Sequence, residues 1–389
     1  MNNILKVLQI VNNNKKILLL TIFFIFSSII DLIGLGLLIP YVNLILNPIN
    51  IYNKFPFLEN LSFFSENIIL NLSILILLIF CSKFIFSLLI NYLIYQNSQK
   101  LIHKLRMQLM NSFQQIDYFT YLKKNSSYYI ECLTTWSHKF GNNILVSLLK
   151  ILNESFNFLV IIIFLSLYNF KLLVLILSFL LVLVFLYSYF FRNILQKYGK
   201  IVNVTNEKIT QLINESFIGF KDIRIYKKEN LFFNWIKKNS LYSIRNTIKA
   251  LMITNSNRYF FELLAVIFFV SLVILSFFNN SLIKLEISGI LIFGYGLLRL
   301  MPISNSLLGS YLRIKQDSYV IEKVFNEIKA SKKNKLKKNN YLKNEENFQK
   351  FENILLKNVN YKYNKKNSVT LSNINFNIKK GEKVAIVGK

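Results

Sequence analysis

Long apolar segments alternate with polar segments along most of the chain. A helix needs about 20 apolar residues to cross the hydrocarbon core of a bilayer. Segments of about this length occur at residues 17–46, 68–95, 144–168, 172–191, 259–278 and 287–308. The pattern predicts an all-α polytopic membrane domain with six long transmembrane helices.

The polar connections between these segments differ greatly in length. Residues 168–171 and 279–286 form short connections, whereas residues 96–143 and 192–258 form long ones of helix-compatible sequence. We expect the spans flanking the long connections to continue as helices outside the membrane.

The distribution of basic residues predicts the orientation in the membrane. Residues 192–258 hold thirteen lysines and arginines, whereas Lys54, Lys171 and Lys284 each stand alone in the three loops predicted to lie outside. Because cytoplasmic loops carry the excess of Lys and Arg, we expect the long connections and both termini to be cytoplasmic.

Composition excludes several other classes of protein. Hydrophobic residues make up 53% of the chain, too many for an ordinary soluble domain, and the formal net charge is +28. The basic residues flank apolar segments, which is typical of loops at an anionic membrane surface and argues against nucleic-acid binding. Two cysteines and two histidines without ligand spacing predict neither a disulfide framework nor a metal site.

After the last span the sequence changes character. Residues 329–350 form a lysine-rich segment that we interpret as a basic linker, and residues 351–389 show short alternating runs rich in β-branched residues. These runs predict strands at 354–363, 369–378 and 383–387. The C-terminal segment is therefore predicted to be the first strands of an α/β domain.

The last predicted strand runs into Gly388. A strand followed by glycine is the start of a phosphate-binding loop, in which backbone N–H groups face a polyphosphate. Gly388 would be only the first residue of a G-x-x-x-x-G-K-[ST] pattern, and Lys389 would fall at a variable position of it.

The segments 358–363, 371–376 and 380–388 together resemble the beginning of an ATP-binding cassette. The resemblance implies that Tyr363 stacks on adenine, that Gly388 begins the Walker A loop, and that the full-length protein uses ATP and Mg²⁺. It makes residues 351–389 an N-terminal cassette fragment cut inside Walker A. Enzymatic activity of this chain is uncertain, since it lacks the Walker A lysine, the signature motif, Walker B and the switch histidine.

The first 328 residues, with six spans and two long inside connections, resemble the membrane domain of an ABC exporter half-transporter. Four stretches resemble the branch that flips lipid-linked oligosaccharides: 31–40, 121–127, 215–224 and 299–305. The resemblance implies an ATP-driven transporter of a lipid-linked oligosaccharide or polysaccharide precursor in the bacterial inner membrane, paired with a second half-transporter, by default an identical one. Two alternatives stay open: export of another lipid, peptide or drug, and a truncated, transport-inactive membrane protein.

Two turns within the long inside connections mix aromatic and charged residues. We interpret them as coupling helices that dock on a cassette and transmit its closure to the spans; the alternative is a pair of solvated hairpins. The residues concerned are Asp117, Tyr118, Phe119 and Tyr121 in the first turn, and Gly219, Phe220, Asp222 and Ile223 in the second.

Five charged residues lie within or near the predicted spans: Asp31, Lys83, Glu154, Glu262 and Arg299. A charge at the bilayer centre costs about 2.5–3.5 kcal/mol on insertion scales, so these side chains are expected to line a cavity or to pair. We assign Arg299, Asp31 and Glu262 to a substrate cavity, with Arg299 meeting an anionic group such as a lipid pyrophosphate. The alternative is a structural ion pair of Arg299 with Asp31 or Glu262, and Lys83 and Glu154 are expected to snorkel to an interface.

Overall fold

The computed structural model describes residues 7, 9–10, 14–46, 68–116, 118–168, 170–278, 287–338, 352–362 and 370–387. The chain divides into two compact units. The first comprises residues 1–110 and 126–328, and the second comprises residues 111–125 and 329–389.

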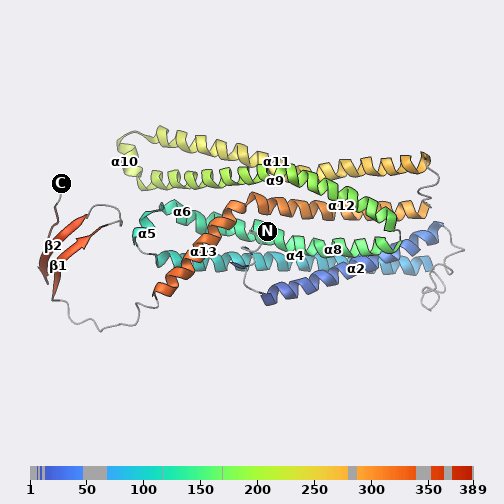
Figure 1. The fold of residues 1–389 in the computed structure, drawn as a ribbon, viewed down its shortest axis with the longest axis horizontal. Coiled ribbons are helices and arrows are strands. Elements are labelled where there is room, and N and C mark those ends of the chain that lie inside the picture. The colour runs from blue at the N-terminus through green and yellow to red at the C-terminus, as the bar shows by residue number, and fades with distance from the viewer. Residues whose placement is uncertain are drawn as a thin grey trace. The chain divides into compact units, whose positions relative to one another are not determined.

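Long helices dominate the first unit (Figure 1). They are α2 (Asn14–Leu46), α4 (Ile68–Gln114), α8 (Val146–Tyr168), α9 (Phe170–Ile218), α11 (Glu229–Phe278) and α12 (Ile287–Gln316). Each predicted span falls on one of these helices, and α9 and α11 continue through the long connection between the fourth and fifth spans as expected.

Three stretches of described helix are long and apolar enough to cross a membrane: Ile69–Gln114, Ser126–Leu167 and Leu177–Ile218. A shorter apolar stretch, Leu18–Gly34, lies on α2. The six-span topology itself stays a prediction.

The core of the first unit is built around α12, which packs against α8, α9 and α11. Leu165, Leu183, Phe261, Leu300 and Leu312 are buried in one apolar cluster there. These helices carry apolar side chains on all sides. Each helix therefore buries one apolar face in the core and exposes another.

The exposed face of α4 is strongly apolar. Leu77, Leu78, Phe84 and Ile85 are each more than 60% exposed. Contiguous apolar surface of this kind is rare on soluble monomers and is the normal surface of a helix that contacts lipid or a partner protein.

An aromatic cluster joins two parts of the first unit. Trp136, in the π-helical segment η4 (Cys132–Trp136), is fully buried and packs edge-on against Tyr128 at 5.3 Å and Tyr319 at 5.9 Å. The Tyr128 hydroxyl donates a 2.7 Å hydrogen bond to Glu327 Oε1. Burial raises the pKa of Tyr128 above its usual range. Since Tyr319 and Glu327 lie on α13 (Ser318–Lys338), the cluster holds the start of that helix in place.

The second unit contains α5 (Tyr118–Leu122) and an antiparallel pair of strands, β1 (Asn353–Tyr361) and β2 (Leu371–Lys379). The register shifts twice along the pair. Asn358 and Asn373 adopt positive φ, and their backbone N–H groups donate to the side chains of Asn375 and Asn360 at 2.7 and 2.8 Å. Asparagine tolerates this conformation, and the side-chain oxygens of asparagines on the opposite strand replace the lost ladder hydrogen bonds.

One prediction at the C-terminal end requires correction. Residues 383–387 do not form a strand, because no neighbouring strand among the described residues supplies the hydrogen bonds that define one. The lysine-rich segment begins as helix, since α13 continues through Lys338, and its role as a linker stays a prediction. Lysine is a good helix former, so a lysine run can extend a helix into solvent.

A charged cluster between apolar helices

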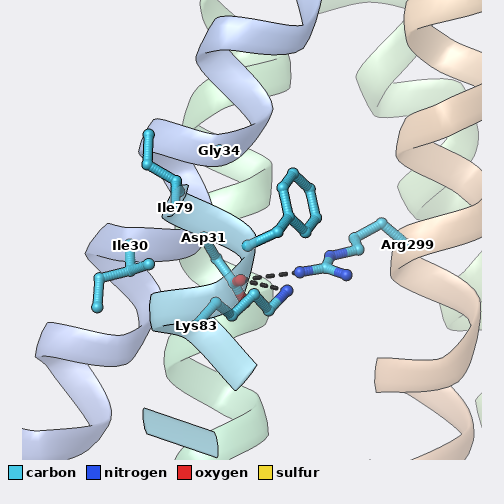
Figure 2. A pocket seen from close by; sticks show the side chains of 7 residues that line it. Ile30, Asp31, Gly34, Ile79, Lys83 and Arg299 are labelled. Carbon is cyan, nitrogen blue, oxygen red and sulfur yellow. Dashed lines mark hydrogen bonds and ion pairs between the residues drawn. The ribbon is translucent and has the colours of Figure 1, made fainter. Parts of the chain in front are cut away.

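The most distinctive polar feature of the first unit is a carboxylate shared by two cations (Figure 2). Arg299 Nη2 on α12 donates to Asp31 Oδ1 on α2 at 2.8 Å. Lys83 Nζ on α4 forms an ion pair with the same oxygen. The cluster joins three helices that are far apart in the sequence.

Gly34 on α2 and Ile79 on α4 lie beside this contact. Gly34 lies one turn after Asp31, on the same face of α2. A Cβ at Gly34 would lie 3.5 Å from Ile79 Cγ2, and Ile79 lies one turn before Lys83 on α4. Gly34 and Ile79 therefore lie side by side next to the charged pair.

The cluster lines a small pocket. Its lining residues are Ile30, Asp31, Gly34, Ile79, Phe80, Lys83 and Arg299. Asp31 is 7% exposed, whereas Lys83 and Arg299 are 19% and 27% exposed, so the cations are the accessible part. One carboxylate against two cations leaves one surplus positive charge among the lining residues. Apolar surroundings strengthen the attraction of this charge for an anion.

Glu154 on α8 lies near the cluster. Its carboxylate interacts with the side chains of Asn153 and Asn157 on the same helix and electrostatically with Asp31 and Lys150. Glu154 and Lys83, both expected to snorkel, are instead partnered within the helix bundle.

Glu262 lies apart from this arrangement. It pairs at 2.8 Å with Arg258, one turn away on α11, and the two side chains are 50% and 70% exposed. Of the three residues assigned to the cavity, the structure thus brings Asp31 and Arg299 together and places Glu262 in a local exposed pair.

The second predicted coupling turn forms α10 (Phe220–Ile225), which connects α9 to α11 after Gly219 (Figure 1). Phe220, Ile225 and Tyr226 are 57%, 62% and 71% exposed. Asp222 and Ile223 lie within the short helix. Its exposed apolar side chains form a surface suited to docking.

The first predicted coupling turn contains α5, in the second unit. Tyr118 and Tyr121 stack at 6.4 Å and are 73% and 41% exposed. Asp117 and the side chain of Phe119 lie outside the described residues, as do Tyr363 and Gly388.

Lys83 belongs to the cluster, although its sequence position was interpreted as that of a side chain that snorkels to an interface. Its central place in an apolar segment, between Phe80 and Phe84, was the available signal. A lysine so far from both ends of a span is expected to pair with an acidic side chain and not to snorkel to the interface.

Comparison with known families agrees with this architecture. The model of the family described as ABC transporter transmembrane region matches residues 17–295. The match begins in α2 and ends within α12, so it includes Asp31 and Lys83 and stops just before Arg299. It spans most of the chain, and the chain belongs to the family of ABC transporter transmembrane regions.

Proposed function

We propose that the chain is the membrane domain of an ATP-driven exporter that flips a lipid-linked oligosaccharide or polysaccharide precursor across the bacterial inner membrane. Membership of the ABC transporter transmembrane family supports export. The cluster of Asp31, Lys83 and Arg299 is the observation that carries the substrate class.

A phosphorylated lipid suits this cluster because it combines an apolar tail with an anionic group. Guanidinium makes forked, charge-assisted hydrogen bonds to phosphate oxygens, and lysine adds a point charge. The partly exposed faces of Arg299 and Lys83 supply both contacts, while the apolar helices around them suit an isoprenoid chain.

Asp31 has a defined part in this proposal. Without substrate its carboxylate neutralises one of the two cations, which limits the cost of holding them between apolar helices. A phosphate that enters the pocket competes with Asp31 for the same donors. Substrate binding then exchanges an internal anion for an external one and loosens the link of α2 and α4 to α12.

In this proposal ATP drives transport through the ATP-binding cassettes, which close together when they bind nucleotide and separate after hydrolysis. The exposed side chains of α10 and α5 are the proposed docking points. The helix α9 has 49 residues, which at 1.5 Å each makes it about 70 Å long, more than twice the bilayer core. A rigid element of that length can carry movement at α10 into the membrane.

The proposed assembly is a homodimer in which two such chains enclose one substrate path, with both termini cytoplasmic. The exposed apolar face of α4 offers surface for lipid or for the second copy. The proposal includes six spans per chain, which the segment lengths and the basic inside loops support.

Substrate-stimulated ATP hydrolysis tests the proposal. The protein that carries this chain with a complete cassette is reconstituted in liposomes with a polyprenyl pyrophosphate oligosaccharide, an uncharged polyprenol, or a hydrophobic cationic dye. We expect stimulation by the pyrophosphate lipid alone. Stimulation by the dye alone would favour a drug exporter, and absence of any hydrolysis would favour a transport-inactive protein.

A further inference from the structure

Three lysines of the first unit each lie over the aromatic ring of a tyrosine, with 5.5–5.9 Å between the ammonium nitrogen and the ring centre. None of the three is in an ion pair within the part of the chain that the structure describes, although Glu154 acts electrostatically on Lys150. The three pairs, which we call the lysine–tyrosine belt, are Lys150 with Tyr95, Lys249 with Tyr198, and Lys315 with Tyr311.

Two of the pairs lie at the same height in the helix bundle. Gly199 on α9 lies directly against the carbonyl group of Gln316 on α12. Tyr198 immediately precedes Gly199, and Lys315 immediately precedes Gln316. Because Lys249 on α11 lies over the Tyr198 ring, α9, α11 and α12 each contribute a member of the belt at this height.

The register of α8 against α12 can be read from two contacts. Asn143 Nδ2 donates to Asp317 Oδ2 at 2.7 Å, just beyond the ends of the two helices. A Cβ at Gly296 would lie 3.0 Å from Leu165 Cδ1. The order of the contacting residues is opposite on the two segments, so α8 and α12 run antiparallel.

This register places the third pair at the height of the other two. Lys150 follows Asn143 by seven residues, and Tyr311 precedes Asp317 by six. At 1.5 Å per residue, Lys150 and Tyr311 lie within about 2 Å of the same height. The belt therefore occupies about one helical turn on all five helices that contribute to it.

The exposed surface of α4 changes character at the belt. Tyr92 and Tyr95 are exposed and follow a series of exposed apolar side chains, whereas Lys100 and Lys104 are exposed further along the helix. Tyrosine at the boundary between an apolar and a basic surface is typical of the membrane–water interface.

We propose that the lysine–tyrosine belt binds the phosphate groups of anionic lipids and fixes the level of the bilayer surface on the side of the long connections. A tyrosine ring and a lysine stem cover apolar surface while the ammonium group extends toward the head groups. Lysines near an anionic leaflet attract its lipids. The inference concerns the surrounding lipid whatever the substrate is, so it goes beyond the proposed function.

The belt also gives the depth of the charged cluster. Lys83 precedes Tyr95 by twelve residues on α4, and Arg299 precedes Tyr311 by twelve residues on α12. Both intervals correspond to about 18 Å along the helix. The head-group layer takes up about 5–7 Å of this distance, and the hydrocarbon core is about 30 Å thick. The cluster therefore lies near the middle of the bilayer.

Lipid selectivity tests the binding part of the inference. Phosphatidylglycerol and phosphatidylcholine with the same acyl chains are titrated against the detergent-purified 389-residue chain, and bound lipids are counted by native mass spectrometry. We expect tighter binding of phosphatidylglycerol. The triple variant Lys150→Gln, Lys249→Gln, Lys315→Gln should lose at least about fivefold of this preference, since one lysine near the surface contributes about that factor.

A second triple variant controls for net charge. Lys221→Gln, Lys228→Gln and Lys237→Gln remove three exposed lysines outside the belt, and Lys237 itself lies over a ring, that of Phe233. This variant should keep the preference for phosphatidylglycerol. An equal loss in both triple variants would overturn the inference in favour of a general effect of charge, and an unchanged preference in the belt variant would overturn it outright.

The depth of two labels on α4 tests the level of the belt without removing any lysine. Cys81 is exposed and lies two residues before Lys83, whereas Cys132 is buried. A fluorophore is attached to Cys81, or to Tyr95→Cys in a Cys81→Ser background, in phosphatidylglycerol bilayers that carry a nitroxide on the head group or in mid-chain. The mid-chain nitroxide should quench the label at Cys81 more strongly, and the head-group nitroxide the label at Tyr95→Cys. Stronger mid-chain quenching at Tyr95→Cys would contradict the proposed level.

Discussion

Gly199 on α9 lies directly against the carbonyl group of Gln316, the last residue of α12. A Cβ at position 199 would overlap that carbonyl, which is backbone and cannot move aside as a side chain can. We therefore expect Gly199→Ala to destabilise the protein by about 1–3 kcal/mol or more, the usual cost of overpacking. Thermal unfolding followed by circular dichroism in detergent measures this.

Gly36→Ala is the matched control, because nothing lies within 4 Å of a Cβ at that position. It removes a helix glycine, and helix propensity alone predicts a gain of up to about 1 kcal/mol. Equal unfolding temperatures for Gly199→Ala and the unmodified protein would show that α9 and α12 are farther apart than described.

The charged cluster predicts that removing the Asp31 carboxylate destabilises the protein more than removing the Lys83 charge. Asp31→Asn leaves both Lys83 and Arg299 unpaired between apolar helices, and a loss of at least about 1–3 kcal/mol is expected. Lys83→Met leaves Asp31 paired with Arg299 at 2.8 Å, so a smaller loss is expected. Unfolding temperatures of the two variants make the comparison. A larger loss for Lys83→Met would contradict the shared-carboxylate geometry.

Asp317, at the junction of α12 and α13, predicts a pH dependence of stability. Burial raises the pKa of this carboxyl above its ordinary value of 3.8, against the opposing effects of the Lys139 charge and the Asn143 hydrogen bond. The folded state therefore holds the proton more tightly than the unfolded state. The contribution of Asp317 to stability is therefore largest below pH 3.8 and is lost as the pH rises through the folded-state pKa.

Asp317→Asn removes this titration. The variant should match the unmodified protein near pH 4 and unfold at a higher temperature at pH 8. The difference between the two melting curves isolates Asp317 from other titrating groups. A variant that is less stable at pH 8 would show that attraction to Lys139 outweighs the cost of burial.

The exposed residues of α10 predict a defect in coupling without a defect in folding. Phe220→Ala and Ile225→Ala remove contact area from a proposed docking surface, and we expect a roughly fivefold or larger loss of substrate-stimulated ATP hydrolysis. Unfolding should change by less than about 0.5 kcal/mol. Tyr242→Ala, a comparably exposed aromatic on α11, should affect neither property. Normal coupling in both α10 variants would remove α10 from the docking surface.

The lengths of the apolar segments located the long helices well, since a run of about 20 apolar residues has few alternatives to a helix. The positions of the two short turns could be predicted from the sequence equally well, because polar and aromatic residues interrupt long helical segments there. Within the site, Arg299 and Asp31 were predicted as members because an unpaired charge in an apolar segment needs a partner.

The identity of each partner depended on three-dimensional packing. Glu262 was a plausible partner of Arg299. It pairs instead with Arg258, which lies one helical turn before it on α11. Lys83 pairs with Asp31 because α4 and α2 bring the two side chains together, a relation between segments that neither segment shows alone.

Translocation of a polyprenyl pyrophosphate oligosaccharide in liposomes tests the central claim most directly. The protein with a complete cassette is reconstituted beside its Arg299→Met variant, and accessibility of the sugar to an external glycosidase is followed with and without ATP. The account predicts ATP-dependent translocation that falls about tenfold or more in the variant, because the loss of a charge-assisted phosphate contact removes about 1.5–3 kcal/mol. ATP-dependent translocation that is unchanged in Arg299→Met would contradict it.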